Sequence, residues 1–478
     1  MITEDKIAYM ESYKRLFTED DDTGRLQRAL DYLNSKDGGI LNLEKGKRYY
    51  LKRKNYKEGC FIKLYHDICL NGNEATFYLD NNSDFGGISG IFKCLDIRNA
   101  IYKDFLFDTS LVTIEDDNHF VDGFYLRYTG TGNINVHFNN IKFLGTKYQI
   151  PLNFSTYYES SETNFGYNVS LKNCKIFQTS YPTCINDLTY ENVTWNVDLD
   201  VSRVSWYENV AQSPFKFTGK CGFCTGIQMN NCTVNINGSR NPITLFECMR
   251  SEVEINNLKV NNNSKVYITS NVMSSSSKDY GLSNKETLLT MNNCDMIEYS
   301  CYYGELARVV LNNCKLGNNN ALYSIYNIHE KQSTLEKANG KIILNNCYFK
   351  DTSNRFYLDN GYSQIEMNNC IVEYDRSKAI RNGFNIGNNS NMIINNCIFI
   401  INGTGAAYLF NLNGAKQFIV DGITITRGTY SGETTEYMIN CSSNIEFISI
   451  QNYFNPLRKL GTPIIRINPE TTISNINI

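Results

Sequence analysis

The chain repeats one short sequence motif. In each copy Asn stands directly before Cys or an aliphatic residue, and an apolar residue stands three positions before that Cys or aliphatic residue. The strongest copies are Leu171-Lys172-Asn173-Cys174, Met229-Asn230-Asn231-Cys232, Met291-Asn292-Asn293-Cys294, Leu311-Asn312-Asn313-Cys314, Leu344-Asn345-Asn346-Cys347, Met367-Asn368-Asn369-Cys370 and Ile394-Asn395-Asn396-Cys397. The interval between copies, weaker ones included, ranges from 19 residues (Cys174 to Val193) to 39 (Val193 to Cys232). Ankyrin and TPR helices keep a fixed period, whereas here the motif is constant and the interval is elastic, so the motif is predicted to form a core and the intervals loops.

The residues around each motif predict strands. Apolar residues alternate with period 2, as in Ile342 and Leu344 before the turn and Cys347 and Phe349 after it, and this is the period of a strand. A strand, turn and strand that recur without hairpin dipeptides between the copies are typical of rungs stacked ~4.8 Å apart around one core. The predicted fold is therefore all-β, a single-stranded right-handed parallel β-helix.

The Asn residue of each motif has a predicted structural role. Asn tolerates the left-handed backbone of a tight turn, and stacked Asn side chains can hydrogen-bond from rung to rung as a ladder. We expect both properties of Asn173, Asn231, Asn293, Asn313, Asn346, Asn369 and Asn396.

Seven of the 16 Cys residues stand at the motif position that Val193, Leu258 or Ile423 fills elsewhere. They are therefore predicted to be small buried hydrophobes with free thiols, made in a reducing cytoplasm. Residues 1–22 are rich in charge where a signal peptide would be apolar, which predicts a chain made without a leader. Cys221 and Cys224 form a lone C-x-x-C, for which a zinc or redox role is the alternative.

Composition excludes two classes of partner. The net charge is -3 and Lys and Arg do not cluster, which argues against nucleic-acid binding. No stretch approaches the ~18 apolar residues of a membrane span, so no membrane insertion is predicted. Aromatic residues make up 13% of the chain, a content that suits both stacked strands and carbohydrate-facing surfaces.

The first sixty residues predict short helices before the solenoid. Apolar residues at near-helical spacing predict an amphipathic helix within Thr3–Phe17, so residues 1–20 are expected to be a cap or a docking segment. A second helix is predicted after Asp21-Asp22-Thr23-Gly24, which supplies N-cap chemistry, and it is expected to end at Gly38-Gly39. Residues 21–60 then form this helix and the first rung, and residues 61–478 form the β-helix.

This N-terminal pattern resembles that of a known superfamily. Asp21-Asp22-Thr23, the helix residues Leu26-Gln27 and Ala29-Leu30-Asp31, then Gly38-Gly39-Ile40 and a Gly46 turn before Tyr49 resemble the start of pectate-lyase-like parallel β-helices, notably bacteriophage tailspikes. That superfamily includes lyases, hydrolases, epimerases and inert adhesins, so the resemblance implies a fold more than a chemistry.

The resemblance implies a phage tailspike or tail-fibre protein that recognises, and in the catalytic case depolymerises, a bacterial surface polysaccharide. It further implies a homotrimer that contacts other virion tail proteins and is located in the tail. One alternative is a non-catalytic structural or adhesin β-helix of a virion. Another is a cellular polysaccharide lyase or hydrolase, which the absence of a signal peptide disfavours.

Cleavage of a polysaccharide needs two carboxylates that flank the bond, for hydrolysis, or a base with Ca²⁺ or Arg that acidifies a uronate, for lyase action. Rungs ~4.8 Å apart bracket the ~5 to 9 Å separations that hydrolases use. Acidic residues lie beside aromatic ones in the middle rungs, although outward carboxylates on solvated strands are also ordinary. The predicted catalytic residues are Glu208, Glu247, Glu305, Asp198 and Asp200, and the predicted carbohydrate-binding residues are Trp195, Trp206, Tyr207, Tyr302 and Tyr303.

No cofactor is predicted, with Ca²⁺ as the open alternative. The cluster Glu115-Asp116-Asp117-Asn118-His119 offers oxygen ligands for Ca²⁺, and a solvated turn explains it equally well. Asn196-Val197-Asp198 echoes the first polygalacturonase motif, but no His has the flanking glycines of its Gly-His-Gly element. A serine nucleophile signature, a P-loop and a dinucleotide fingerprint are also missing from the sequence.

Overall fold

The structure is a computed structural model. It describes residues 4–52, 57–84, 90–112, 121–128, 134–145, 149–156, 167–178, 189–191, 194–198, 215–218, 224–237, 243–249, 251–262, 268–273, 287–297, 299–303, 307–317, 323–327, 341–352, 355–358, 364–375, 382–403, 408–429, 438–458, 461 and 463–478. The chain forms two compact units, of which unit 1 comprises Met1–Asn241 with Lys259–Lys265 and unit 2 comprises Pro242–Leu258 with Val266–Ile478.

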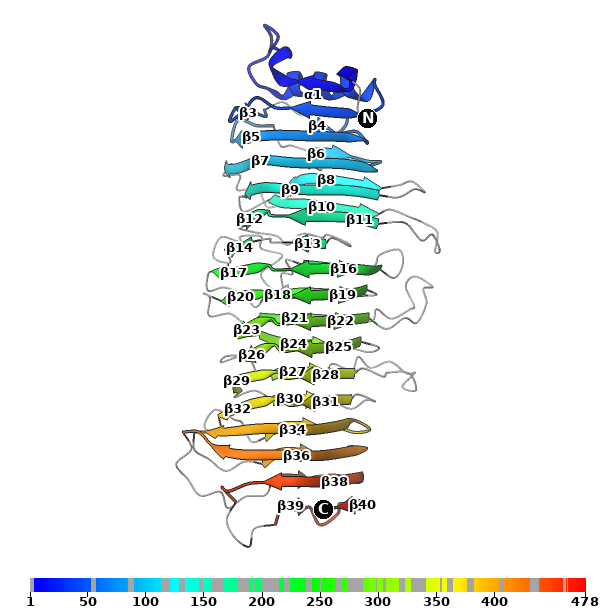
Figure 1. Cartoon of the computed structure of the whole chain (residues 1–478), viewed down its shortest axis with the longest axis vertical. Helices are drawn as coiled ribbons and strands as arrows, with labels where there is room; N and C mark the ends of the chain where they lie inside the picture. The colour runs from blue at the N-terminus through cyan, green and yellow to red at the C-terminus, as the bar shows by residue number, and fades with distance from the viewer. Residues whose placement is uncertain are drawn as a thin grey trace. The chain divides into compact units, whose positions relative to one another are not determined.

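Nearly every element in either unit is a strand (Figure 1). Unit 1 contains η1 (Glu4–Lys6), β1 (Ile7–Tyr9), η2 (Met10–Ser12), α1 (Thr23–Asn34), β2 (Gly39–Asn42), β3 (Arg48–Tyr50), β4 (Cys60–Lys63), β5 (Ile68–Asp80), β6 (Gly90–Cys94), β7 (Asn99–Leu111), β8 (Val121–Tyr128), β9 (Ile134–Leu144), β10 (Gln149–Thr156), β11 (Tyr167–Lys172), β12 (Lys175–Gln178), β13 (Thr189–Glu191), β14 (Thr194–Asp198), β15 (Phe215–Thr218), β16 (Cys224–Asn230), β17 (Thr233–Asn237) and β20 (Lys259–Asn262).

Unit 2 contains strands alone among its described residues. They are β18 (Ile243–Met249), β19 (Ser251–Asn256), β21 (Ile268–Met273), β22 (Thr287–Asn292), β23 (Asp295–Ile297), β24 (Tyr299–Tyr303), β25 (Ala307–Asn312), β26 (Lys315–Gly317), β27 (Tyr323–Asn327), β28 (Lys341–Asn345), β29 (Tyr348–Thr352), β30 (Arg355–Leu358), β31 (Gln364–Asn368), β32 (Ile371–Asp375), β33 (Asn382–Ile386), β34 (Asn391–Asn402), β35 (Tyr408–Leu412), β36 (Gln417–Arg427), β37 (Ile439–Cys441), β38 (Ile445–Phe454), β39 (Ile465–Ile467) and β40 (Ile473–Asn477).

The strands of unit 2 pair in parallel, with register shifts in the pairs β18–β21, β27–β30 and β29–β32, and this confirms the predicted parallel β-helix. Met291 of β22 aligns with Leu311 of β25, and Leu311 aligns with Leu344 of β28. The same column continues to Met367 of β31 and Ile394 of β34. All five side chains are at most 2% exposed, so the apolar position of each motif copy stacks into one continuous core.

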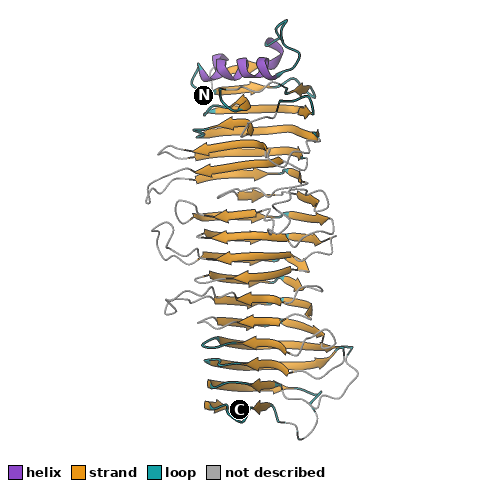
Figure 2. Ribbon diagram, turned by 180° about the vertical axis from the view of Figure 1, so that it is seen from behind, coloured by secondary structure: helices purple, strands orange, loops and turns teal. Residues whose placement is uncertain are grey.

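Unit 1 has the same parallel construction with an aromatic core. The Phe124 ring of β8 lies 4.9 Å from that of Phe92 and 5.2 Å from those of Tyr102 and Phe138. Helix α1 packs against the first strands of this unit, as the purple helix in Figure 2 shows. Within the described part of the chain no helix is long and apolar enough to cross a membrane.

The predicted second helix is confirmed as α1, although its N-cap residue Asp22 makes no side-chain capping bond and the helix ends at Asn34, before Gly38-Gly39. The side chain of Asp21 accepts the N–H of Thr23 at 2.7 Å, and Gly38 donates its N–H to the carbonyl of Leu33 at 3.0 Å. Gly38 has a φ of 96°, a backbone conformation that glycine adopts without steric cost.

The predicted helix within Thr3–Phe17 is wrong. The segment instead forms the strand β1 between the short turns η1 and η2, and Ile7 of β1 aligns with Ile40 of β2. The helical spacing lacks a face to bury, because Phe17 is fully exposed while only Met10 of the spaced apolar residues is buried. Pairing with the open edge of β2 satisfies the backbone of β1, and this tertiary contact outweighs the local pattern.

The motif Asn residues adopt the left-handed turn as predicted. All seven, from Asn173 to Asn396, have φ between 52° and 55°. The ladder, however, belongs mainly to the preceding residue. In unit 2 the side-chain amide of each rung donates to the side-chain oxygen of its neighbour at 2.8 or 2.9 Å along Asn256, Asn292, Asn312, Asn345, Asn368 and Asn395. One motif Asn pair, Asn313 with Asn293, forms a longer 3.2 Å bond.

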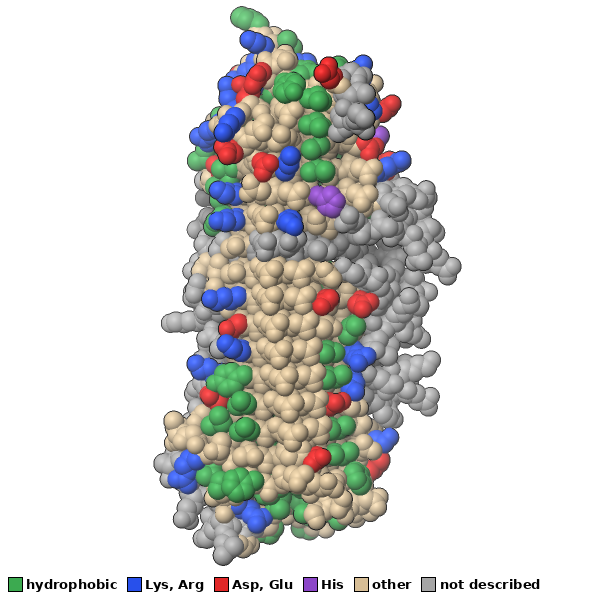
Figure 3. Space-filling model, viewed as in Figure 1, with side chains coloured by type: hydrophobic (Ala, Val, Ile, Leu, Met, Phe, Trp, Pro, Cys, Tyr) green, Lys and Arg blue, Asp and Glu red, His purple; other side chains and the backbone are tan. Residues whose placement is uncertain are grey.

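Apolar side chains border the ladder on the surface of unit 2. Figure 3 shows a tan strip of backbone and of side chains that are neither hydrophobic nor charged, with hydrophobic side chains in green on both sides of its lower part. On the β32 and β34 side, Ile371 and Ile398 align with each other and are 37% and 39% exposed. Within each motif the second Asn therefore adopts the positive φ of the turn, and the first Asn forms the hydrogen bonds between rungs.

The motif cysteines are buried and free, as predicted. Burial raises the pKa of the Cys174 thiol to about 11. At about pH 8 we therefore expect Cys174 to react with Ellman's reagent roughly 100-fold slower than an exposed thiol, because the thiolate is the reacting species. The absorbance of the released thionitrobenzoate, with and without denaturant, measures this. A fast phase that disappears in Cys174→Ser would contradict the prediction, whereas the half-exposed Cys69 is the internal reference for a faster thiol.

Candidate functional site

One column of register positions in unit 2 combines a carboxylate with several tyrosines. Glu247 of β18 aligns with Asn271 of β21, and Asn271 aligns with Tyr302 of β24. The column continues from Tyr302 to Tyr326 of β27 and Tyr357 of β30. It then reaches Asn385 of β33, Asn411 of β35, Asn440 of β37 and Arg466 of β39.

At β33 and β35 the column occupies the outward register of its sheet. Asn385 is half-buried between the buried residues Phe384 and Ile386, and Asn411 is half-buried between Phe410 and Leu412. Parallel strands in register keep the same face from rung to rung. Asn411 donates to Asn385 and Asn440 donates to Asn411, each at 2.7 Å between the side-chain amide nitrogen and oxygen. A polar ladder therefore extends from the tyrosine positions.

The structure brings together two of the residues that the sequence singled out, and it adds two more. Glu247 and Tyr302 share the column, two strands apart. Tyr326 and Tyr357 were not predicted, because the elastic intervals hide which residues align. Their signal is local: each follows an apolar residue, Ile325 or Phe356, that pairs within the adjacent column.

The other predicted residues lie elsewhere or outside the described residues. Trp195 of β14 aligns with Ile176 and Val234, which are both buried, so its register is that of the core of unit 1. Asp198 aligns with Asn237, and Tyr303 holds the register position next to Tyr302. Outside the described residues are Asp200, Trp206, Tyr207, Glu208, Glu305, Cys221 and the cluster from Glu115 to His119. The two-carboxylate site and the Ca²⁺ site therefore stay predictions.

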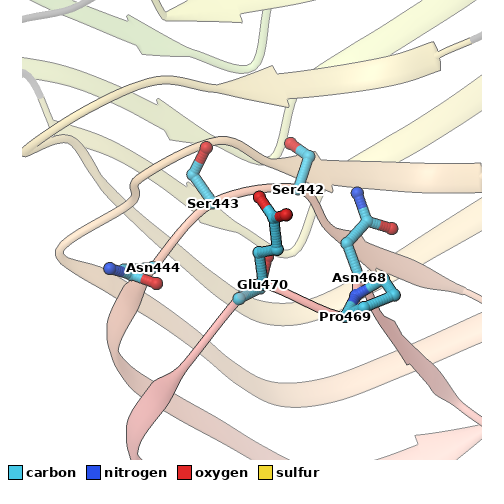
Figure 4. Close-up of a pocket in the computed structure, with 7 residues that line it drawn as sticks. Ser442, Ser443, Asn444, Asn468, Pro469 and Glu470 are labelled. Atoms are coloured by element: carbon cyan, nitrogen blue, oxygen red, sulfur yellow. The ribbon is translucent and has the colours of Figure 1, made fainter.

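A polar hollow of about 510 Å³ lies where β37 joins β38 and β39 joins β40 (Figure 4). Its lining is Ser442, Ser443, Asn444, Asn468, Pro469, Glu470 and Thr471. The hydroxyl of Ser442 donates to the carbonyl of Leu412 at 3.2 Å, and that of Ser443 donates to Asn413 at 2.7 Å. The serine oxygens therefore keep lone pairs as acceptors.

Glu470 adds a carboxylate to this hollow. Figure 4 shows its side chain directed toward Ser442 and Ser443. Acceptors that face one hollow suit a ligand rich in hydroxyl donors, and a sugar is such a ligand. The lining contains one carboxylate, so it can hold a sugar but cannot supply the acid and base pair of a hydrolase. The described residues also contain no group of three side chains that could hold a metal ion.

Four described carboxyl groups outside these places, those of Asp22, Glu58, Asp80 and Glu366, have lowered pKa values, and the causes for Glu58 and Glu366 are local hydrogen bonds. A hydrogen bond from Lys63 lowers the pKa of Glu58, at 2.9 Å. A hydrogen bond from Asn368 is the main cause that lowers the pKa of Glu366, and Lys341 adds to it. A catalytic acid needs a raised pKa instead, so none of the four groups is a candidate for that role.

No protein-family model matches the chain, and no curated protein matches it. Among solved structures, a tailspike mutant of E. coli bacteriophage HK620 in complex with a hexasaccharide aligns with 99% of this chain and 78% of its own, at 12% identity and a TM-score of 0.51. A second mutant of that tailspike, in complex with a pentasaccharide, aligns with 98% of this chain and 80% of its own, also at 12% identity and a TM-score of 0.51.

A mannuronan C-5 epimerase A-module from Azotobacter vinelandii aligns with 90% of this chain and 99% of its own, at 12% identity and a TM-score of 0.40. That score is too low to add to the comparison. The two tailspike matches show a shared fold, and they confirm at the level of the fold the resemblance drawn from the N-terminal segment.

Proposed function

We propose that this chain is a polysaccharide-binding parallel β-helix protein and that the column from Glu247 to Asn411 is its binding surface. The observation that carries the proposal is the alignment of Glu247, Tyr302, Tyr326 and Tyr357 in one column of strand register. Aromatic rings offer an apolar face with a polar hydroxyl, and carboxylates and amides exchange hydrogen bonds with hydroxyl groups. Repetition at ~4.8 Å per rung suits an extended chain of repeating sugar units.

The finer proposal is a phage tailspike or tail-fibre protein that recognises bacterial surface polysaccharide. It is supported by the two tailspike structures of the same fold, which are complexes with a hexasaccharide and a pentasaccharide. A homotrimer in the virion tail, in contact with other tail proteins, belongs to this proposal. Cleavage is a separate question, because one described carboxylate, Glu247, stands in the column, and a single carboxylate supports binding rather than hydrolysis.

We expect Tyr326→Ala and Tyr357→Ala each to weaken polysaccharide binding roughly tenfold, since an aromatic platform contributes about 1.4 kcal/mol beyond a methyl group. The measurement is isothermal titration with purified surface polysaccharides from candidate host bacteria. Tyr32→Ala on α1 is the matched control, because Tyr32 is a 37% exposed tyrosine of unit 1 outside the column. Equal affinities for all three variants and the unchanged protein would reject this binding surface.

The same incubations decide whether the protein cleaves its ligand. New reducing ends without unsaturated products would indicate a hydrolase, and absorbance of unsaturated sugars would indicate a lyase. Retained binding without any product would favour the non-catalytic adhesin. In the hydrolase case Glu247→Gln is expected to abolish product while the bound amount stays within roughly threefold.

A further inference from the structure

Five motif cysteines form one column in the core of unit 2. Each cysteine stands directly before a strand, and the strand residues that follow them align from rung to rung. The carbonyl group of each of the first four cysteines accepts the N–H of the residue after the next cysteine, at 2.8 or 2.9 Å. The cysteine column is Cys294, Cys314, Cys347, Cys370 and Cys397. Consecutive rungs therefore place thiol upon thiol.

Burial alone does not require sulfur at this position. The N–H of Asp295 donates to the carbonyl of Leu258 at 2.8 Å, which places Leu258 one rung before Cys294. At the other end Cys397 aligns with Ile423. Leu258, Ile423 and all five cysteines are at most 1% exposed, and the five thiols are free. An aliphatic side chain fills the position at both ends, so packing does not account for five thiols in succession.

The sulfur atoms occupy the same place in each rung. Each Sγ donates to the carbonyl group two residues before its own cysteine, at 3.4 or 3.5 Å. Rungs ~4.8 Å apart put neighbouring Cα atoms within the ~4.4–6.8 Å range that disulfides span, and the side chains point the same way. Cysteines two rungs apart lie beyond that range. The geometry therefore allows disulfides between neighbours in the column and excludes other pairs.

The column also stabilises the reactive form of a thiol. A hydrogen bond from the thiol of Cys294 is the largest cause that lowers the pKa of Cys314, and one from Cys347 adds to it. The bond between Cys294 and Cys314 raises the pKa of Cys294 in turn, so Cys314 gives up its proton first. No cysteine stands one motif copy before or after Cys174, and burial raises the pKa of that thiol. Because the thiolate is the nucleophile, the column is expected to react before an isolated buried thiol such as Cys174.

We propose that the cysteine column is an oxidation site, at which hydrogen peroxide joins neighbouring rungs of unit 2 through disulfides. The thiolate of one cysteine attacks a peroxide oxygen, the O–O bond breaks, and a sulfenic acid and hydroxide form. The thiolate of the neighbouring cysteine then attacks the sulfenic sulfur, the S–O bond breaks and a second hydroxide leaves. The two protons released by the thiols convert both hydroxides to water. Two sulfur atoms are oxidised for each peroxide reduced.

Peroxide is the oxidant of choice for a buried column because it is a small, uncharged molecule. A brief local opening of one rung admits it to the core, whereas a peptide disulfide needs a much wider opening. The reaction uses no residue of the proposed polysaccharide surface. It is therefore independent of the proposed function, and either proposal can fail without the other.

The test is peptide mapping of the full chain after incubation with hydrogen peroxide in the absence of denaturant. Remaining thiols are alkylated with iodoacetamide, and the chain is digested with trypsin without reduction. A lysine or arginine stands between every two consecutive cysteines of the column, so each one reaches the mass spectrometer on a separate peptide. We expect disulfides between neighbours only, at most two per chain because the column has five members, and an alkylated Cys174.

Two matched variants use the order of the column. Cys347→Val leaves the pairs Cys294–Cys314 and Cys370–Cys397, so two disulfides per chain are expected. Cys314→Val isolates Cys294, which is expected to stay alkylated while one disulfide forms among the other three cysteines. Both variants are expected to fold, because Leu258 and Ile423 show that this position accepts an aliphatic side chain.

Four outcomes overturn the proposal. They are a column that stays fully alkylated after peroxide, column cysteines that end as sulfinic acids instead of disulfides, disulfides between cysteines that are not neighbours, and a Cys314→Val variant in which Cys294 is still linked. The last two would mean that the links form in an unfolded chain, where the register of the rungs no longer decides which cysteines meet.

Discussion

Replacing Asp22 by Ala is expected to lower the free energy of unfolding of unit 1 by about 3–5 kcal/mol, the usual loss when one partner of a buried ion-pair network is removed. Asp22 is 1% exposed. Its carboxylate accepts hydrogen bonds from Arg15, from Arg25 at 2.7 Å and from the N–H of Tyr50 at 2.8 Å. Without it, Arg25 would keep a buried positive charge whose remaining ion-pair partner among the described residues is Glu44, at 3.4 Å.

Urea unfolding followed by circular dichroism measures this loss. Asp20→Ala is the matched control, because the carboxylate of Asp20 is 51% exposed and pairs with Lys52 at 2.5 Å. An exposed pair of this kind contributes about 0–1 kcal/mol. A loss at Asp22 no larger than that at Asp20 would contradict the network described for α1.

The same carboxyl group makes the stability of unit 1 depend on pH. Burial alone would raise the pKa of Asp22, but the hydrogen bonds from Arg15 and Tyr50 and the charge of Arg25 outweigh it, so the pKa is lowered from 3.8. A lowered folded-state pKa stabilises the fold fully above the ordinary pKa, and this contribution is lost as the pH falls through the folded-state pKa. Asp22→Asn is therefore expected to lose this part of the acid dependence below about pH 4.

The rungs could be predicted from sequence because the motif repeats the physical requirement of every turn. Each copy needs a residue that accepts a positive φ, and Asn meets it at Asn173 and Asn346 alike, with φ of 54° and 53°. Each copy also needs a small apolar residue inside, and a buried cysteine such as Cys174 meets that need. Requirements that recur are visible in one sequence without knowledge of the spacing.

Contacts that depend on the register between neighbouring strands could not be predicted from the sequence. The column of Glu247, Tyr302, Tyr326 and Tyr357 joins residues separated by intervals of unequal length, and only the strand register shows that they meet. Sequence reasoning therefore found Glu247 and Tyr302 by their neighbours and missed the two tyrosines that complete the column.

The prediction of a helix in the N-terminal segment was wrong for a different reason. Its apolar spacing favoured a helix, but Ile7 lies where the free edge of β2 can pair with it. Local spacing contains no information about that edge. Phe17, which the predicted helix would have placed on its apolar face, is instead fully exposed.

Replacing Asn345 by Ala is expected to destabilise unit 2 by about 2–3 kcal/mol, because two side-chain hydrogen bonds are lost and their partners remain half-buried. Asn345 donates to Asn312 at 2.8 Å and accepts from Asn368 at 2.9 Å. The loss would leave the oxygen of Asn312 and an N–H of Asn368 without those partners. Urea unfolding gives the total, and hydrogen exchange of the neighbouring rungs locates it.

Asn346→Gly, one residue later, is the control that tests the division of work within the motif. Asn346 has an exposed side chain and a φ of 53°, which glycine adopts freely, so the change is expected to cost less than about 0.5 kcal/mol. If Asn346→Gly instead cost as much as Asn345→Ala, the turn residue would carry the ladder, as the sequence alone suggested. A larger loss in the free energy of unfolding for Asn345→Ala than for Asn346→Gly would show that the two adjacent asparagines have different roles. Asn346 would set the backbone conformation of the turn, and Asn345 would join neighbouring rungs although the intervals between them differ in length.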